Sequence, residues 1–231
     1  MSFLDTNPKA TLTLRVLAKL LGYPDAELRR HLPELRDALQ SERALSFSRR
    51  AELDALMDGL AKAGALEAEA TYVELFDRGR STSLHLFEHV HGDSRDRGPA
   101  MIDLVRTYEK AGLLLGPHEL PDHLPVVLEF ASTQPPKEAR AFLAEMVHIL
   151  SAIFSALQQR QSPYASVLGA LIELAGERAQ PVKVAPEESL DESWAEPAAF
   201  DGCSVKGQAR PGAPQPVQIV RKIHASEGVR A

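Results

Sequence analysis

Residues 11–25, TLTLRVLAKLLGYPD, carry the apolar spacing that decides the fold. Leucines three and four residues apart share one face of an α-helix, and here they are Leu14, Leu17 and Leu21. Gly22 and Pro24 then end the helix, because glycine accepts a left-handed C-cap and proline cannot continue the backbone ladder. The stretch therefore predicts an amphipathic helix with a leucine-rich face turned toward a core.

Similar periodicity continues to about residue 178 and predicts an all-α protein built as a single helical bundle. A second helical segment follows Asp25, its candidate N-cap, and Pro33 should divide that segment in two. Further helices are expected at 48–63, 65–77, 137–160 and 163–176. Three more helices are expected with less certain bounds. One runs from Thr82 or Ser83 through His91, and the next begins between Asp93 and Pro99. The third starts at Asp122 and has Pro125 in its first turn.

Two of these helices carry apolar faces that we expect to be buried. In the helix at 65–77 the face consists of Leu66, Ala70, Val73 and Phe76. In the helix that ends before Gly112 it consists of Met101, Leu104, Val105 and Tyr108. Both faces are expected to join one common core.

Residues 181–231 differ in composition, because they are dense in Pro, Gly, Ser and acids and lose the apolar period. This composition predicts a flexible tail after an all-helical domain at 1–180. Trp194 and Phe200 are large apolar side chains within it, and their docking on the domain is as plausible as a free tail. The lone cysteine, Cys203, excludes an internal disulfide.

The composition also excludes several classes of partner. The 231 residues are 44% hydrophobic, and the net charge of −6 is spread along the chain rather than gathered in a block. We therefore expect no nucleic-acid partner. The opening residues MSFLDTNPKA lack the plan of a secretion signal, and no apolar run approaches the roughly 20 residues that span a bilayer. The expected location is the cytoplasm, without direct membrane insertion.

Residues 85–89, HLFEH, fit the H-x-x-E-H pattern of a zinc-peptidase helix. On a helix, His85 and His89 would share a face, with Glu88 as the neighbouring general base. A catalytic zinc needs a third protein ligand, and no later acid is singled out for that role. The favoured interpretation is a partly exposed polar helix face without metal, and a zinc-dependent hydrolase stays as the alternative.

Other catalytic signatures are missing from the sequence. It contains no phosphate-binding loop, no dinucleotide-binding glycine pattern and no serine nucleophile elbow. Its cysteine falls in the expected tail, which is a poor place to position a nucleophile. We therefore expect neither catalytic residues nor a resident cofactor.

Two stretches resemble a known family. They are YVELFDRGRSTSLHLFEHVHGDSRDRGPAMIDL at 72–104 and ELPDHLPVVLEF at 119–130. Both closely resemble the NarJ-type chaperones, the nitrate reductase delta subunits, and weaker similarity covers 15–28 and 157–175. The resemblance implies an all-α, non-catalytic protein of the TorD-like type. Such proteins bind a terminal peptide of a molybdoenzyme's catalytic subunit and hold the apoenzyme until its cofactor is in place.

The resemblance also bears on the zinc pattern. It implies that the family motif keeps F-E-H-V-H-G but does not require a histidine at the position of His85, so a zinc-binding pair is not what the family preserves. With the residues themselves, it suggests a groove for the apolar face of a basic amphipathic helix. The expected walls are Tyr72, Phe76, Leu84 and Phe87, and the expected acidic rim is Asp77, Glu88 and Asp93. Arg80, His89, Asp122 and His123 complete the expected site, while Arg78, Arg95 and Arg97 are expected, like Arg80, to tie the loops to neighbouring acids. Simple core packing of each aromatic residue is an equally weighted alternative.

The partner implied is the catalytic subunit of a nitrate reductase, bound through its N-terminal peptide. A permanent structural subunit of the same enzyme is a third possibility. It differs from a chaperone only in staying bound after assembly, and the sequence does not separate the two.

Overall fold

The computed structural model describes residues 9–92, 94–180 and 182, and no β-strand occurs among them, so the all-α class is confirmed. The chain divides into two units, Met1–Glu187 and Glu188–Ala231, and the described residues all lie in the first. Trp194, Phe200 and nearly all of the expected tail at 181–231 lie outside the described residues. The domain boundary expected at residue 180 stays a prediction.

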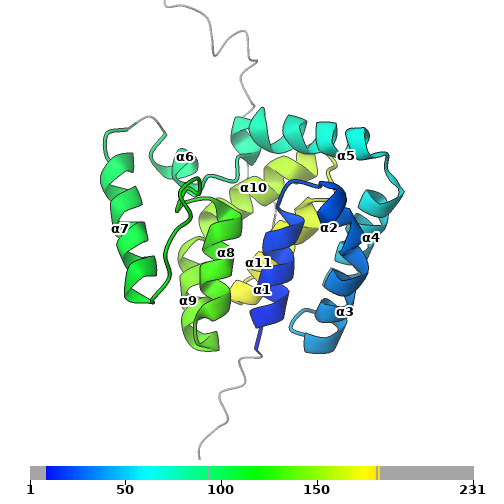
Figure 1. Cartoon of the computed structure of the whole chain (residues 1–231), viewed down its shortest axis with the longest axis horizontal. Coiled ribbons are helices and arrows are strands. Elements are labelled where there is room, and N and C mark those ends of the chain that lie inside the picture. The colour runs from blue at the N-terminus through cyan, green and yellow to red at the C-terminus, as the bar shows by residue number, and fades with distance from the viewer. Residues whose placement is uncertain (1–8, 93, 181, 183–231) are drawn as a thin grey trace, which may run out of the picture. The chain divides into compact units, whose positions relative to one another are not determined.

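Figure 1 shows the arrangement of the helices. They are α1 (Thr11–Leu20), α2 (Ala26–Arg30), α3 (Leu32–Glu42), α4 (Phe47–Lys62), α5 (Ala65–Tyr72), α6 (Leu86–Val90), α7 (Arg97–Lys110), α8 (Leu124–Thr133), α9 (Pro136–Glu145), α10 (Val147–Gln159) and α11 (Ala165–Ala175). A π-helical turn, η1 (Val73–Asp77), continues α5 directly, and a 3₁₀ turn, η2 (Arg80–Thr82), follows it.

The core is centred on α11, which packs against α10, α9, α4 and α1, while α1 lies along α8. Eight of the 11 residues of α11 are buried. The leucines of the opening stretch lie in this core, because Leu14, Leu17 and Leu21 are at most 2% exposed. Burying a leucine side chain contributes about 1.5–3 kcal/mol relative to leaving it in water, so this face holds α1 in the bundle.

The segment after Asp25 divides as expected. The Asp25 carboxylate accepts the Leu28 N–H at 2.8 Å and so caps α2. Pro33 lies in the first turn of α3, where the missing N–H of proline leaves no hydrogen bond unmade. The division therefore comes from a proline that starts a helix rather than from one that bends it.

The single helix expected at 137–160 is wrong, because α9 and α10 meet at a bend of 65° near Met146. The apolar period continues through the break, so the sequence gives no sign of it. The bend lets α9 cover both α8 and α11 while α10 packs along α11. Among the described residues no single helix is both long and apolar enough to cross a bilayer, and only the bent α9–α10 pair meets that test by length and composition.

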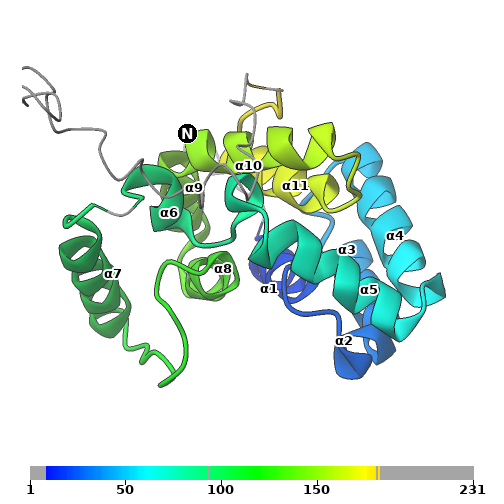
Figure 2. The ribbon, with the colours of Figure 1, turned by 90° about the horizontal axis from the view of Figure 1, so that it is seen from above.

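The buried face expected for α5 is also wrong in part. Leu66 is 79% exposed and Ala70 is exposed, whereas the inward positions are Ala68, Tyr72, Leu75 and Phe76. The Tyr72 hydroxyl donates to the Leu21 carbonyl at 2.8 Å, and this buried bond sets the rotation of α5 across the end of α1 (Figure 2). The more strongly apolar aromatic face therefore enters the core, and the Leu66 face is left outside.

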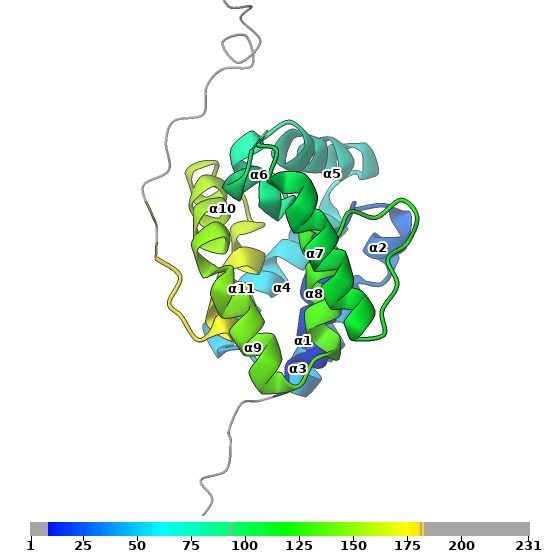
Figure 3. The ribbon, with the colours of Figure 1, turned by 90° about the vertical axis from the view of Figure 1, so that its left-hand side faces the viewer.

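Helix α7 lies on the outer side of α8 (Figure 3). Of the four residues expected to be buried there, only Tyr108 is, while Met101, Leu104 and Val105 are half-buried. The Tyr108 hydroxyl donates to the Pro121 carbonyl at 2.7 Å, and its ring packs on Phe130 with centroids 4.7 Å apart. One aromatic anchor thus supplies the buried contact of this helix.

Candidate functional site

The turn after α5 is held in a tight conformation. A β-carbon on Gly79 would lie 2.5 Å from the Leu75 carbonyl oxygen, so only glycine fits there without a shift of the backbone. The buried Thr82 hydroxyl donates to that same Leu75 carbonyl and, at 3.2 Å, to the Gly79 carbonyl. Residues 79–82 are therefore tied beneath η1, and single π-helical turns of this kind are frequent at functional sites.

An aromatic cluster lies behind this turn. Tyr72 and Phe76 have ring centroids 4.9 Å apart, and Phe76 meets Tyr164 edge to face at 5.1 Å. Tyr23 adds an edge contact with Tyr72 at 5.6 Å. Tyr72, Phe76 and Tyr164 are at most 6% exposed, so core packing, the alternative weighed for these aromatic residues, accounts for most of their surface.

A short antiparallel bridge between His85 and His123 brings two distant segments together. The Leu86 N–H donates to the Asp122 carbonyl at 3.0 Å, and the Leu124 N–H donates to the Leu84 carbonyl at 2.8 Å. This pairing keeps His85 extended, with φ −87° and ψ 102°, so α6 begins only at Leu86. The helix start expected at Thr82 or Ser83 is therefore wrong.

Asp122 lies at the centre of a buried polar network. Its side chain is fully buried and accepts the Phe87 N–H at 3.2 Å, while His85 Nδ1 lies at 3.5 Å and Arg97 Nη2 at 3.8 Å. Burial alone would raise the pKa of Asp122, but the hydrogen bonds from His85 and Phe87 and the positive charge of Arg97 lower it overall. The carboxylate therefore caps the first turn of α6 rather than α8, which corrects the expected N-cap.

The H-x-x-E-H residues do not converge on a common point. His85 faces Asp122, whereas His89 Nε2 lies 2.9 Å from the Ser83 carbonyl oxygen. Glu88 accepts the Ser83 hydroxyl at 2.6 Å and pairs with Arg97 at 3.5 Å. Because His85 precedes the helix, the shared face that a zinc pair needs is not formed. The described part of the chain contains no group of three His, Cys, Asp or Glu residues placed to hold a metal ion.

A cavity of about 470 Å³ opens between η1, η2, α6 and the loop before α8. It is lined by Tyr72, Phe76, Asp77, Arg78, Gly79, Arg80, Ser83, Leu84, His85, Glu88, Gly92, Arg97 and His123. Most of the expected site residues that the structure describes thus reach one hollow. The exceptions are Phe87, His89 and Asp122, which lie outside the lining, and Asp93 lies outside the described residues.

This cavity lies within the part of the chain that matches a known family. The model of that family, described as nitrate reductase delta subunit, matches residues 23–169. The nitrate reductase molybdenum cofactor assembly chaperone NarJ of Escherichia coli (strain K12) is 44% identical over 182 residues, which are 79% of this chain and 77% of that relative. The chain belongs to the nitrate reductase delta subunit family.

Two further proteins are similar to this chain at lower identity. A candidate NarJ chaperone of Bacillus subtilis (strain 168) is 31% identical over 164 residues, which cover 70% of this chain and 86% of that one. A crystal structure of a candidate redox enzyme maturation protein from Archaeoglobus fulgidus shares the fold, with a TM-score of 0.51, 18% identity, and coverage of 72% and 94%. The expectations of a TorD-like all-α fold and of a non-catalytic protein are confirmed by the family and the fold together.

The charges at the cavity of this delta subunit differ from the expected acidic rim. Asp77 is exposed at its edge, but Glu88 already pairs with Arg97, and three arginines line the hollow. Arg78 pairs with the neighbouring acid Glu74 at 3.4 Å, as expected, but both side chains are exposed, and the role of Arg78 in holding the loop stays a prediction. The rim of the cavity therefore carries both arginines and acids. Asp77 is its clearest acidic residue, because Glu88 is already paired with Arg97.

Two histidines of the delta subunit stack at the cavity wall, with ring centroids 5.0 Å apart. The hydrogen bond to Asp122 raises the pKa of His85, whereas burial and the charge of His85 lower that of His123. The sequence did not predict His85 as a residue of the peptide site. The β-bridge that brings His85 to His123 joins segments 38 residues apart, and no local pattern contains it. The one available signal was that both segments carry the family resemblance.

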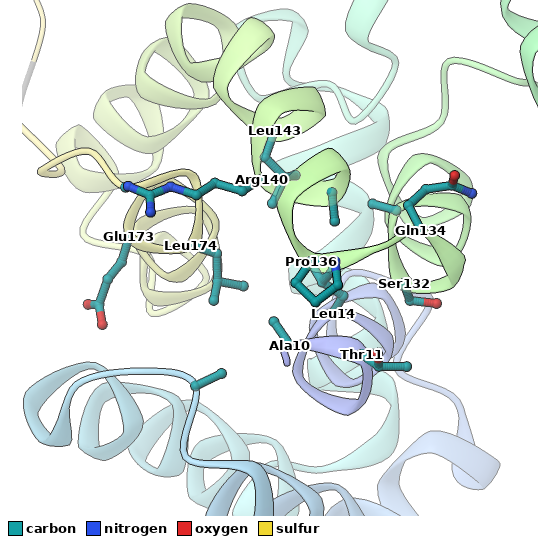
Figure 4. A pocket seen from close by; sticks show the side chains of 14 residues that line it. Ala10, Thr11, Leu14, Ser132, Gln134, Pro136, Arg140, Leu143, Glu173 and Leu174 are labelled. Carbon is teal, nitrogen blue, oxygen red and sulfur yellow. The ribbon is translucent and has the colours of Figure 1, made fainter. Parts of the chain in front are cut away.

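A second hollow, shown in Figure 4, lies where the start of α1 meets the α8–α9 turn and the end of α11. Its volume is about 160 Å³, and its labelled walls include Leu14, Leu143 and Leu174 beside Arg140 and Glu173. None of the expected site residues lines it. The larger cavity at η1, which most of the expected site residues line, is therefore the candidate functional site of this chain.

Proposed function

We propose that this delta subunit is an assembly chaperone that binds the N-terminal peptide of an apo nitrate reductase catalytic subunit. It holds that subunit competent for molybdenum cofactor insertion and membrane assembly, and then departs. The observation that carries the proposal is the η1 cavity of about 470 Å³, within the family-matched residues and lined by most of the expected peptide-binding residues. Its volume lies in the range of roughly 300–1,000 Å³ that is typical of ligand sites.

The cavity offers a peptide helix a small apolar floor within a mainly polar lining. Tyr72, Phe76 and Leu84 supply an aromatic and aliphatic floor, and their buried bodies keep that floor rigid. A rigid floor lowers the ordering cost of binding, because few side chains have to be immobilised. Asp77 at the edge is placed to pair with a Lys or Arg of the peptide, which fixes its direction.

The fully buried Asp122 network supports this site from below. Asp122 joins the loop before α8 to α6 and to the first residue of α7, so both walls of the cavity depend on one carboxylate. The proposed role of Asp122 is therefore to shape the cavity rather than to touch the peptide. The same holds for Glu88, which is occupied by Ser83 and Arg97.

Calorimetry with a synthetic N-terminal peptide of the cognate catalytic subunit tests the proposal. We expect binding that weakens as salt rises, since an ion pair at an exposed rim is screened. Asp77→Lys should weaken the peptide by roughly tenfold, about 1.4 kcal/mol, because attraction becomes repulsion. Asp37→Lys, at an exposed position of α3, changes the net charge equally and should leave binding unchanged.

Absence of binding, or equal weakening by both lysine variants, would reject the η1 cavity as the peptide site. Circular dichroism of each variant establishes that its helices are intact. Whether the chain is absent from the purified mature reductase then separates a departing chaperone from a permanent subunit.

A further inference from the structure

The outward side of α5 and η1 carries apolar side chains that are not buried in the core. Leu66 and Ala70 of α5, Val73 of η1 and Tyr23 of the loop between α1 and α2 line one hollow, and these four residues are named the outer strip here. Leu66 is 79% exposed and Tyr23 is 48% exposed. An apolar row at helical spacing normally faces a core, but the core side of α5 is already filled by its aromatic residues. Exposed apolar residues gathered in this way make a candidate docking surface.

The outer strip lines a hollow of about 360 Å³, and its border is acidic. Glu69 and Glu74 line the hollow, and the Tyr23 hydroxyl donates to Glu69 at 3.2 Å. Among the described residues that line it, Arg78 is the one base, and Glu74 pairs with it. Desolvation, the hydrogen bond to Glu69 and the negative charges of Glu69, Asp77 and Asp25 raise the pKa of Tyr23, which agrees with a local negative potential.

The outer strip adjoins the η1 cavity. Arg78 lines both hollows, so they meet at the end of η1. The edge of the Tyr23 ring also contacts Tyr72, which forms part of the cavity floor. A ligand that fills the cavity and continues past Arg78 therefore passes onto the outer strip.

We infer that the outer strip is the second half of one extended groove, and that its occupant is the continuation of the bound peptide helix beyond the η1 cavity. The inference rests on the proposed function and adds the chemistry of the partner. The part of the helix over α5 carries apolar residues three or four apart that face Leu66 and Val73. Lys or Arg residues beside them face Glu69 and Glu74.

Length and charge both favour this occupant. A helix of about 15 residues is roughly 22 Å long, while the ten residues from Leu66 to Phe76 span roughly 15 Å at a helical rise, so one peptide reaches both hollows. A second copy of this chain fits poorly, because a symmetric contact would place the acidic borders of the two strips against each other.

Calorimetry with two synthetic peptides from the start of the catalytic subunit tests the inference: one of roughly 10 residues, long enough for the cavity alone, and one of roughly 20 residues. Leu66→Lys places a base on the strip at a largely exposed position, so the fold should be retained. Leu114→Lys is the matched control, since Leu114 is 87% exposed and does not line either hollow. We expect Leu66→Lys to weaken the long peptide about tenfold and to leave the short one unchanged, while Leu114→Lys affects neither.

Unchanged affinity of the long peptide for the Leu66→Lys chain would overturn the extended groove while leaving the η1 cavity as the peptide site. Equal weakening of both peptides would also overturn it, because Leu66 would then act on the cavity or on the fold. If neither peptide bound the unaltered chain, the proposed function itself would fail. The outcomes thus separate the failure of the inference from that of the function.

Discussion

Helices α11 and α7 are of similar length and both carry apolar residues, yet they stand at opposite extremes of burial. Eight of the 11 residues of α11 are buried, whereas α7 has 14 residues and buries Tyr108 alone. Helix α11 is enclosed by α10, α9, α4 and α1, while α7 lies on the outer side of α8. The difference teaches that an amphipathic pattern predicts a helix reliably but does not say how much of its apolar face a neighbour will cover.

The two helices are also held by different forces. Helix α11 is held by dispersed apolar packing, which contributes through many small contacts. Helix α7 depends on a few specific bonds, namely the Tyr108 hydroxyl to Pro121 and the pairing of Arg97 with Asp122 and Glu88. Regions with few buried apolar contacts open locally at a lower free energy than the core, and α7 is expected to be such a region.

The largest effect is expected from a cavity in α11. Leu171→Ala removes a side chain that is fully buried, and we expect it to lower the free energy of unfolding by about 2–5 kcal/mol. The matched change in α7, Ile102→Ala, alters a side chain that is 54% exposed and should cost less than about 0.5 kcal/mol. Denaturant unfolding followed by circular dichroism measures both. A similar loss in the two variants would break the contrast between the helices.

An intermediate effect is expected at Asp122, which joins the two regions. Asp122→Ala removes the acceptor of the Phe87 N–H and of His85 and one of the two carboxylates that pair with Arg97, and we expect a loss of about 1–3 kcal/mol. Hydrogen exchange should quicken most in α6 and α7, while the amides of α11 keep their protection. The control is Asp103→Ala, because Asp103 pairs only with exposed Arg106 at 3.4 Å and should contribute little.

Loss of protection in α11 as large as that in α7 would show that Asp122 supports the whole bundle. In that case the attachment of α7 could not be treated separately from the core. Unchanged exchange in both regions would instead show that the interactions of Asp122 only offset the free-energy cost of burying its charge and add no net stability.

Much of the fold follows from local patterns. The leucine spacing of α1, the Asp25 cap of α2 and the end of α7 before Gly112 each rest on neighbours in the sequence, and the structure agrees with them. The bend between α9 and α10 and the rotation of α5 do not, because both depend on which distant helix offers a surface. The Tyr72 hydroxyl turns α5 by bonding to a carbonyl 51 residues away, and no local pattern contains that bond.

The residues of the candidate site also fall into two groups, those that a local pattern predicts and those that depend on distant contacts. The stretch 72–88 supplied most of the cavity lining, because those residues lie close together in sequence as well as in space. His85 and Arg97 were missed as lining residues, since the β-bridge to His123 and the burial of Asp122 place them there. The H-x-x-E-H pattern failed for the same reason, because that bridge holds His85 out of the helix.

The smallest expected effect is a pH dependence at His85. The hydrogen bond to Asp122 raises the folded pKa of His85, while burial and Arg97 oppose the rise and Glu88 assists it. A group with a raised folded pKa contributes stability that is fully present below its unfolded pKa of about 6.5 and is lost as pH rises through the folded value. His85→Gln should therefore cost more at about pH 6 than at about pH 8, as measured by unfolding of both chains at each pH.

A double-variant cycle isolates the source of this dependence. In a chain that already carries Asp122→Ala, the greater cost of His85→Gln at low pH should disappear or reverse, because the carboxylate that raises the pKa of His85 is gone while burial and Arg97 still lower that pKa. The stacked His123 has the opposite sign, since burial lowers its pKa and its protonation disfavours the fold. Because the charges of His85 and Asp122 also act on His123, the cycle is run in a His123→Gln background, which removes this contribution from all four chains. A His85→Gln cost that grew with rising pH would mean that neutral His85 is the stabilising form. The contact between His85 and Asp122 would then be a neutral hydrogen bond rather than an ion pair.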